Sequence, residues 1–104
     1  MKIIYLESAE LALDEIYSFL SQRSEKAAIN LYNKILDEID KLTSFPKMGV
    51  LYHSIIGIRS ILIENKYRVL YFIEDKTIYI ILVWDCRRNP KEFKKKILAF
   101  TQKN

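Results

Sequence analysis

The chain has 104 residues, half of them hydrophobic, with only two glycines and two prolines. This composition excludes a disordered or low-complexity chain, and the length predicts one domain, residues 1–104, with a single core. The net charge is +4 but unevenly spread: residues 1–46 carry five Lys/Arg against eight acids, and residues 47–104 carry twelve against five. An anionic partner would therefore be drawn to the second half.

Cysteine, histidine and glycine usage excludes several classes of site. A lone Cys86 cannot form an intramolecular disulfide, and the first ten residues lack a signal-peptide pattern, so we expect a cytoplasmic protein. No apolar run approaches the roughly 20 residues that a membrane helix needs. Cys86 and His53 form no metal-ligand pattern, and there is no glycine-rich nucleotide motif, so we expect no cofactor or metal and an ordinary loop role for His53.

The first half of the chain predicts a short strand followed by two helices. The apolar run Lys2–Leu6 is typical of an edge strand. Ser8 is the expected N-cap of a helix that continues to Leu20 at helical spacing, and Ser24 is the expected N-cap of a longer helix ending near Thr43. Two amphipathic helices with so short a connection pack antiparallel, and their remaining apolar surface needs a sheet.

The second half predicts three strands. The segment Phe45–Gly49 ends the long helix, because proline and glycine interrupt helical backbone there. After a loop, the apolar β runs are Arg59–Glu64, Tyr67–Ile73 and Thr77–Trp84. The last has no polar break and so predicts a strand covered on both faces in the middle of the sheet. The connection between the last two runs has the length of a hairpin, but without glycine its turn type stays open.

A final helix completes the predicted fold. Asn89 is the expected N-cap, Pro90 suits the first helical position, and Glu92 fits a capping box. Four lysines make this helix basic, and residues 101–104 are expected to fray. The predicted class is α+β: an N-terminal strand and antiparallel αα-hairpin packed on a twisted, mainly antiparallel sheet (β-α-α-β-β-β), with a short C-terminal basic helix.

The arginines of the predicted sheet are the strongest candidates for chemistry. Arg59, Arg68 and the pair Arg87–Arg88 would form a clamp for phosphate or carboxylate if they converged near one end of the sheet. Arg68, on an apolar strand, must either pair with a carboxylate or open onto solvent. The alternative is a set of structural ion pairs, such as Arg88 with Glu92 or Arg68 with Glu64, and both interpretations stay open. The lysines of the last helix are more typical of a solvated face than of a binding site.

Several short motifs, in this order and spacing, resemble the RelE/ParE toxin superfamily, the toxins of bacterial type II toxin–antitoxin operons, also known as plasmid-stabilisation proteins. The similarity covers nearly the whole chain. It comprises Leu11–Ile16, Ala27-Ala28 with the apolar stripe after it, the break at Phe45–Gly49, Gly57-Ile58-Arg59, the strand YRVLY at Tyr67–Tyr71 and the segment DCRRNP at Asp85–Pro90.

The resemblance implies a growth-inhibiting toxin whose cognate antitoxin wraps the sheet and hairpin with its C-terminal segment. RelE-like members enter the ribosome and cleave mRNA, whereas ParE-like members poison DNA gyrase without cutting RNA. The fold implied by the family agrees with the predicted order of elements.

Carried over residue by residue, the resemblance assigns Arg68 to the scissile phosphate, Arg87 to a second phosphate contact and Arg59 to a lysine position. The match breaks at Ile61, which replaces a second lysine, and at Phe93, which replaces a tyrosine or histidine. Phenylalanine has no hydroxyl to exchange a proton, so general acid–base catalysis loses its carrier. These departures and the long hairpin favour the ParE-like branch.

Three hypotheses follow from the sequence. The preferred one is a toxin that binds DNA gyrase and is not itself an enzyme. The alternative is a ribosome-dependent endoribonuclease whose catalytic residues are Arg59, Arg68 and Arg87. The third is an inactive family member that only binds an antitoxin. The expected binding residues are Arg68, Arg87, Arg88, Phe93 and Lys94.

Overall fold

The computed structural model describes residues 1–52 and 57–102, and the side chains of this part up to residue 100. His53 and residues 103–104, with the expectations made for them, lie outside the described residues. The elements are β1 (Lys2–Tyr5), α1 (Glu7–Ser21), α2 (Glu25–Asp40), the 3₁₀ helix η1 (Lys41–Thr43), β2 (Val50–Leu51), β3 (Arg59–Ile63), β4 (Tyr67–Glu74), β5 (Thr77–Asp85) and α3 (Pro90–Gln102). No helix within the described residues is long and apolar enough to span a bilayer.

The strands form one mixed sheet in the order β1-β5-β4-β3-β2. β1 runs parallel to β5, and the other three pairs are antiparallel. This confirms the predicted α+β class, the N-terminal edge strand and the inner position of the apolar strand β5. Strand β2 was not predicted, because its two residues are both exposed and too few to give an alternating pattern. It exists through pairing of Val50 with Ser60 and of Leu51 with Arg59.

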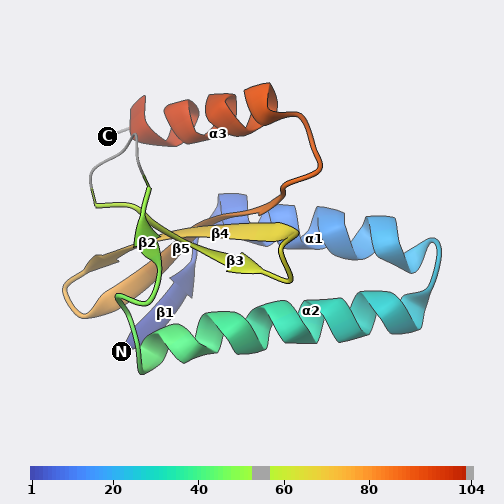
Figure 1. The fold of residues 1–104 in the computed structure, drawn as a ribbon, viewed down its shortest axis with the longest axis horizontal. Helices are drawn as coiled ribbons and strands as arrows, with labels where there is room; N and C mark the ends of the chain where they lie inside the picture. The colour runs from blue at the N-terminus through green and yellow to red at the C-terminus, as the bar shows by residue number, and fades with distance from the viewer. Residues whose placement is uncertain (53–56, 103–104) are drawn as a thin grey trace.

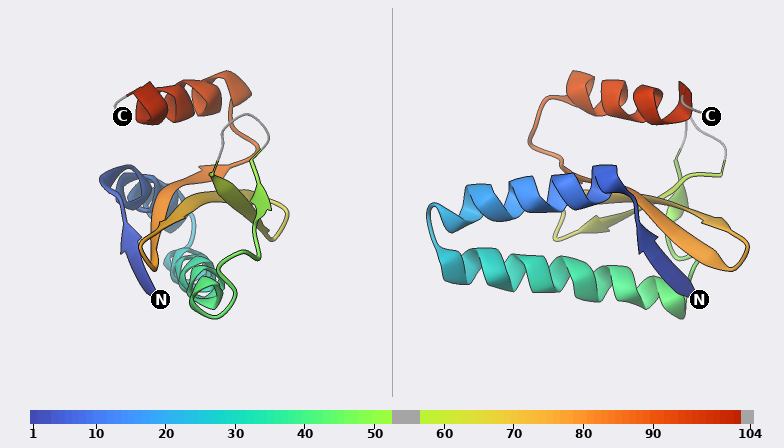
Figure 2. Two further views of the ribbon diagram at one scale, coloured as in Figure 1. Left: turned by 90° about the vertical axis from the view of Figure 1, so that its left-hand side faces the viewer. Right: turned by 180° about the vertical axis from the view of Figure 1, so that it is seen from behind.

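The sheet lies between two helical layers, as the two views of Figure 2 show. The α1–α2 hairpin packs on one face, and α3 runs across the other (Figure 1). The hairpin contributes Ala9, Leu13, Ile35 and Ile39 to the core, all at most 4% exposed. Burying Leu13, Ile35 and Ile39 stabilises the fold by about 1.5–3 kcal/mol each, so most of the hairpin's stability comes from this layer contact rather than from helix propensity.

The faces of the sheet follow from ring contacts and strand register. Trp84 contacts Phe93 of α3 at 5.4 Å between ring centroids, and Phe72 contacts Phe100 of α3 at 6.1 Å. Because side chains alternate along a strand and directly paired residues share a face, Arg68, which pairs with Trp84, also lies on the α3 face. Tyr71, next to Phe72, therefore points to the hairpin face.

The helix starts only partly follow the sequence signals. The predicted caps are confirmed at Ser24, whose hydroxyl accepts a hydrogen bond from the Ala27 N–H, and at Asn89, whose side-chain oxygen accepts from the Lys91 N–H. The prediction for Ser8 was wrong. Helix α1 begins at Glu7 without a side-chain cap, and the Ser8 hydroxyl donates to the Ile81 carbonyl instead. A bulge at Ile81, the unpaired β5 residue between Leu82 and Ile80, accompanies this contact.

The open question about the β4–β5 turn is also resolved. Glu74 pairs with Thr77, so the loop is two residues long, and both of them, Asp75 and Lys76, have positive φ angles of 50° and 62°. Positive φ at both central positions is the type I′ geometry that matches the twist of a hairpin. Asp tolerates this conformation better than most residues, which accounts for the first of the two positions without glycine.

Candidate functional site

Arg87 lies two residues after Asp85, the last residue of β5, and is held by that carboxylate. Its Nε and Nη2 donate to Oδ1 and Oδ2 of Asp85 at 2.9 and 2.7 Å, and its backbone N–H donates to Oδ1 at 2.9 Å. Nη2 also lies 3.4 Å from the Tyr67 hydroxyl. The guanidinium hydrogen bond to Asp85 lowers the pKa of that carboxyl and raises the pKa of Arg87 itself. The guanidinium is thus already engaged with a carboxylate in the fork geometry that a phosphate would use.

Arg88 lies over the ring of Trp84, 4.7 Å from its centroid, and its guanidinium is 3.4 Å from carboxylate oxygens of both Glu15 and Glu92. The ion pair with Glu92 is one of the structural pairs that the sequence left open. Glu92 therefore turns toward Arg88, although its position fits a capping box. Glu15 comes from α1, so Arg88 ties the start of α3 to the hairpin layer.

Arg59 forms hydrogen bonds with the segment that connects α2 to the sheet. Its Nη1 donates to the Gly49 carbonyl at 2.8 Å and approaches the Lys47 carbonyl at 3.4 Å. Tyr71, its cross-strand partner, holds the same segment: its hydroxyl accepts from the Gly49 N–H at 2.9 Å and donates to the Pro46 carbonyl at 2.7 Å. Burial, as the largest cause, raises the pKa of this tyrosine. Arg59 and Tyr71 together fix the Phe45–Gly49 break against the hairpin face of the sheet.

Arg68 is half-buried on the other face of the sheet. Its Nη1 lies 3.3 Å from the Ser60 hydroxyl, and its cross-strand neighbours are Leu62 and Trp84. None of the ion pairs found among the described residues includes Arg68, and it makes no pair with Glu64 there. Of the two possibilities for this charge, a carboxylate partner or an opening to solvent, the structure shows the second.

The predicted site residues at the start of α3 differ in exposure. Phe93 is only 9% exposed and packs against Trp84 and Tyr52, with 6.2 Å between the Phe93 and Tyr52 ring centroids. Its ring holds α3 on the sheet. Lys94, the next residue, is exposed.

The structure does not bring the three arginines together. Arg59 of β3 pairs with Tyr71 of β4 and shares its face of the sheet. Arg68 is three residues before Tyr71 on β4, so Arg59 and Arg68 lie on opposite faces of the sheet. Arg87 lies beside Tyr67. Tyr67 and Tyr71 are four residues apart on β4, which is about 13 Å along the strand. A single phosphate cannot contact all three in this arrangement. Across the described residues, no group of three or more His, Cys, Asp or Glu side chains could hold a metal.

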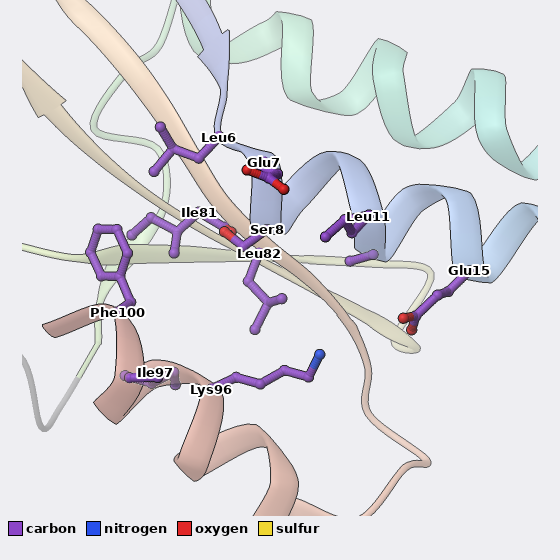
Figure 3. A pocket seen from close by; sticks show the side chains of 12 residues that line it. Leu6, Glu7, Ser8, Leu11, Glu15, Ile81, Leu82, Lys96, Ile97 and Phe100 are labelled. Atoms are coloured by element: carbon purple, nitrogen blue, oxygen red, sulfur yellow. The ribbon is translucent and has the colours of Figure 1, made fainter. Parts of the chain in front are cut away.

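Two hollows lie beside α1, and residues of α1 and β5 line both of them. One, of about 490 Å³, lies between α1 and α3; Figure 3 shows Leu82 between Leu11 of α1 and Ile97 of α3. The other, of about 410 Å³, is lined by Phe19, Tyr67, Arg87 and Arg88 among others. Glu15 borders both. Glu15 could not be predicted as part of this site from the sequence, because its partner Arg88 is 73 positions away.

Comparison with known proteins supplies the family. A comparison with curated proteins found no match. Among solved structures, one described as a chromosomal ParDE toxin–antitoxin system from P. aeruginosa matches with a TM-score of 0.71 and 18% identity, over 82% of this chain and 95% of that chain. At 18% identity this structural match shows a shared fold and nothing about function. The family model for the ParE toxin of type II toxin–antitoxin systems (parDE) matches residues 3–90, and the chain belongs to that family.

Proposed function

We propose that this chain is the toxin of a type II toxin–antitoxin pair and that it acts by binding and poisoning DNA gyrase, without cutting nucleic acid. Membership of the ParE toxin family supports the toxin role. The separation of the three arginines supports a mechanism by binding.

The observation that carries this proposal is the state of the residues that a ribonuclease would need. Arg59 is bound to backbone carbonyls, Arg87 is neutralised by Asp85, and Phe93 is buried and has no ionisable group. In-line attack by a ribose hydroxyl needs a proton acceptor and donor beside the phosphate. Among the described residues, no such group accompanies Arg68.

A supercoiling assay tests the proposal. The purified chain, added to gyrase and relaxed plasmid at micromolar concentration, should suppress supercoiling and accumulate cleaved plasmid after gyrase is denatured. The same preparation should leave translated mRNA intact. The variant Arg23→Ala is the control, because this exposed arginine is outside the predicted catalytic and binding residues, and it should suppress supercoiling as the wild type does. Unchanged supercoiling at that concentration would remove gyrase as the target.

A second candidate, ribosome-dependent mRNA cleavage, is favoured by one observation. Within the part of the chain that the structure describes, Arg68 has one hydrogen-bond partner, the Ser60 hydroxyl, and it lies on a sheet face that is open at Leu62, which is 50% exposed. Its guanidinium could still stabilise negative charge on a phosphate in the transition state.

This candidate predicts codon-positioned breaks in translated mRNA that disappear in Arg68→Ala. The contribution of Arg87 is read from the double variant Asp85→Ala/Arg87→Ala, because the single change would leave Asp85 without its partner. Arg23→Ala, at an exposed arginine in the connection between α1 and α2, is the control. Breaks that persist in both test variants would show that these arginines do not carry the reaction.

The proposed partner of the toxin is a cognate antitoxin, and the proposed location is the cytoplasm. Phe19, Val50 and Leu51 are each more than half exposed and offer apolar area to such a partner. Induced expression in a bacterium without the antitoxin should stop growth, and co-expression of the protein encoded beside the gene should restore it. Normal growth in the first arm would instead favour the third hypothesis, an inactive member that only binds its antitoxin.

A further inference from the structure

The outer surface of α3 is a concentrated positive patch. Lys91, Lys94, Lys95 and Lys96 are all exposed, and the helix holds one acid, Glu92, which is paired with Arg88. No ion pair found in the described part of the chain includes any of these lysines.

The packing of α3 fixes where these lysines lie. Phe93, Ile97 and Phe100 face the sheet, as their burial and ring contacts show. Lys96 borders the hollow between α3 and α1. With about 100° between successive residues of a helix, Lys91 and Lys95 point away from the sheet, and Lys94 takes the flank opposite Lys96. The lysines thus cover most of the solvent side of the first two turns, where Glu92 is the one acid.

This placement works against the helix itself. Lys91 repels Lys94 and Lys95 at i, i+3 and i, i+4, and Lys91 itself lies in the first turn, where the helix dipole disfavours positive charge. The last turn, where the dipole would favour them, has no basic residue. A bound polyanion would relieve both effects.

The rest of the fold makes the patch directional. The opposite layer, residues 7–43, carries eight acids against four Lys/Arg. Figures 1 and 2 place this hairpin and α3 on opposite sides of the sheet. A polyanion is therefore repelled by one layer and attracted to the other, which orients the encounter.

We infer that the lysine face of α3, Lys91, Lys94 and Lys95, binds the phosphate backbone of a double-stranded nucleic acid. The surface is an exposed helix with its charges spread around the outer arc, and lysine ammonium groups serve as point charges for successive phosphates. An acidic peptide would gain affinity from an apolar anchor site among the lysines, whereas Lys91, Lys94 and Lys95 are exposed charges at the positions that point to solvent. The inference concerns a surface separate from the arginines and holds for either proposed target.

The test is fluorescence anisotropy of the full chain with labelled duplex DNA and duplex RNA of equal length and with a labelled oligoglutamate peptide. Three phosphate contacts predict a slope of log K against log salt of about −2.7, and so about a 40-fold weaker affinity at 200 mM than at 50 mM KCl. The variant Lys91→Gln/Lys94→Gln/Lys95→Gln should lose most of this slope and at least about tenfold in affinity at the lower salt. Circular dichroism should show unchanged helix content.

The matched control is Lys2→Gln/Lys26→Gln/Lys76→Gln, which removes the same charge from exposed positions elsewhere. It should keep the wild-type slope. Binding of either duplex that depends on the α3 lysines supports the inference, and the two duplexes identify the source of the phosphates. An equal loss in the control variant, no duplex binding at the lower salt, or binding of oligoglutamate alone would overturn it.

Discussion

At the scale of single residues, the partner of each arginine decides what it can do. Arg59 donates to main-chain carbonyls, Arg87 to the carboxylate of Asp85, and Arg68, among the described residues, to the hydroxyl of Ser60 alone. The same side chain therefore serves as a structural clamp, as half of an ion pair, or as an available charge. Residue type alone could not distinguish these roles.

The pair of Asp85 and Arg87 predicts a measurable pH dependence. Since Arg87 lowers the pKa of Asp85 in the folded chain, the pair contributes stability above the unfolded pKa of about 3.9, and this contribution is lost as pH falls through the folded pKa. Asp85→Asn should cost at most about 1 kcal/mol at neutral pH, because the arginine is largely exposed.

Urea unfolding between neutral pH and strong acid measures this effect. Below about pH 4 the wild type should lose stability toward the level of Asp85→Asn. The control is Asp75→Asn, at an exposed turn position. An acid loss as steep in Asp85→Asn as in the wild type would show that the pair does not contribute.

Gly49 is required by the close approach of Tyr71. A Cβ at this position would lie 2.6 Å from the Tyr71 hydroxyl and 2.8 Å from the Ser60 carbonyl oxygen. We expect Gly49→Ala to destabilise the fold by about 1–3 kcal/mol in urea unfolding, because main-chain atoms cannot move aside cheaply. Tyr71→Phe should cost a similar amount, about 1–3 kcal/mol, by leaving the Gly49 N–H and Pro46 carbonyl without their partner.

Because the two changes disturb the same contact, the double variant should cost less than the sum of the single variants. Tyr79→Phe is the control, since its hydroxyl has no hydrogen bond within the described residues. Strict additivity would contradict the proposed steric coupling between Gly49 and Tyr71.

At the scale of elements, α3 depends on very few side chains. Phe93 and Ile97, at 9% and 5% exposure, are its members of the buried core, with Phe100 packed beside them. α1, by contrast, packs along both β5 and α2. A helix held by so few contacts, with lysines on its other side, has little stability of its own.

Phe93→Ala should therefore act mainly on α3. We expect the free energy of unfolding to fall by about 3–5 kcal/mol if α3 and the sheet unfold together. The fall is smaller if α3 detaches before the sheet unfolds. Urea unfolding gives the first value, and amide hydrogen exchange of residues 91–102 shows whether the helix opens. Lys95→Ala, on the exposed side of the same helix, is the control and should leave both measurements near the wild type.

At the scale of the whole molecule, the sheet is covered on both faces but not equally. β4 and β5 pair along their full length and supply the most buried strand residues, whereas β1 and β2 are edge strands with exposed or half-buried side chains. Stability in such a fold decreases from the central strands outward.

Native-state hydrogen exchange should follow this order. The amides of β4 and β5 should exchange slowest, those of α1 and α2 at intermediate rates, and those of α3 and β2 fastest. Mass spectrometry of peptides after timed exchange measures the order. Protection of α3 equal to that of β5 would show that the C-terminal helix is an integral part of the core.

The predictable part of the fold is the part written in local patterns. The apolar period of α2, the break at Phe45–Gly49, the cap at Ser24 and the unbroken apolar run of β5 each have their cause within a few residues. The failures have distant causes. Ser8 donates to a carbonyl 73 positions away instead of capping its own helix, and β2 exists only because β3 lies beside it.

The candidate site shows the same division. Sequence by itself determined that the charge is basic in the second half, that the sheet carries Arg59, Arg68 and Arg87, and that Phe93 cannot exchange a proton. Only the tertiary structure decided that Arg59 and Arg68 lie on opposite faces, that Asp85 occupies Arg87, and that the acidic hairpin and the basic helix α3 lie on opposite sides of one sheet. The reason is that residue types and helical or strand periods are local properties. Strand register, ion pairing across the fold and the order of layers depend on which distant segments meet.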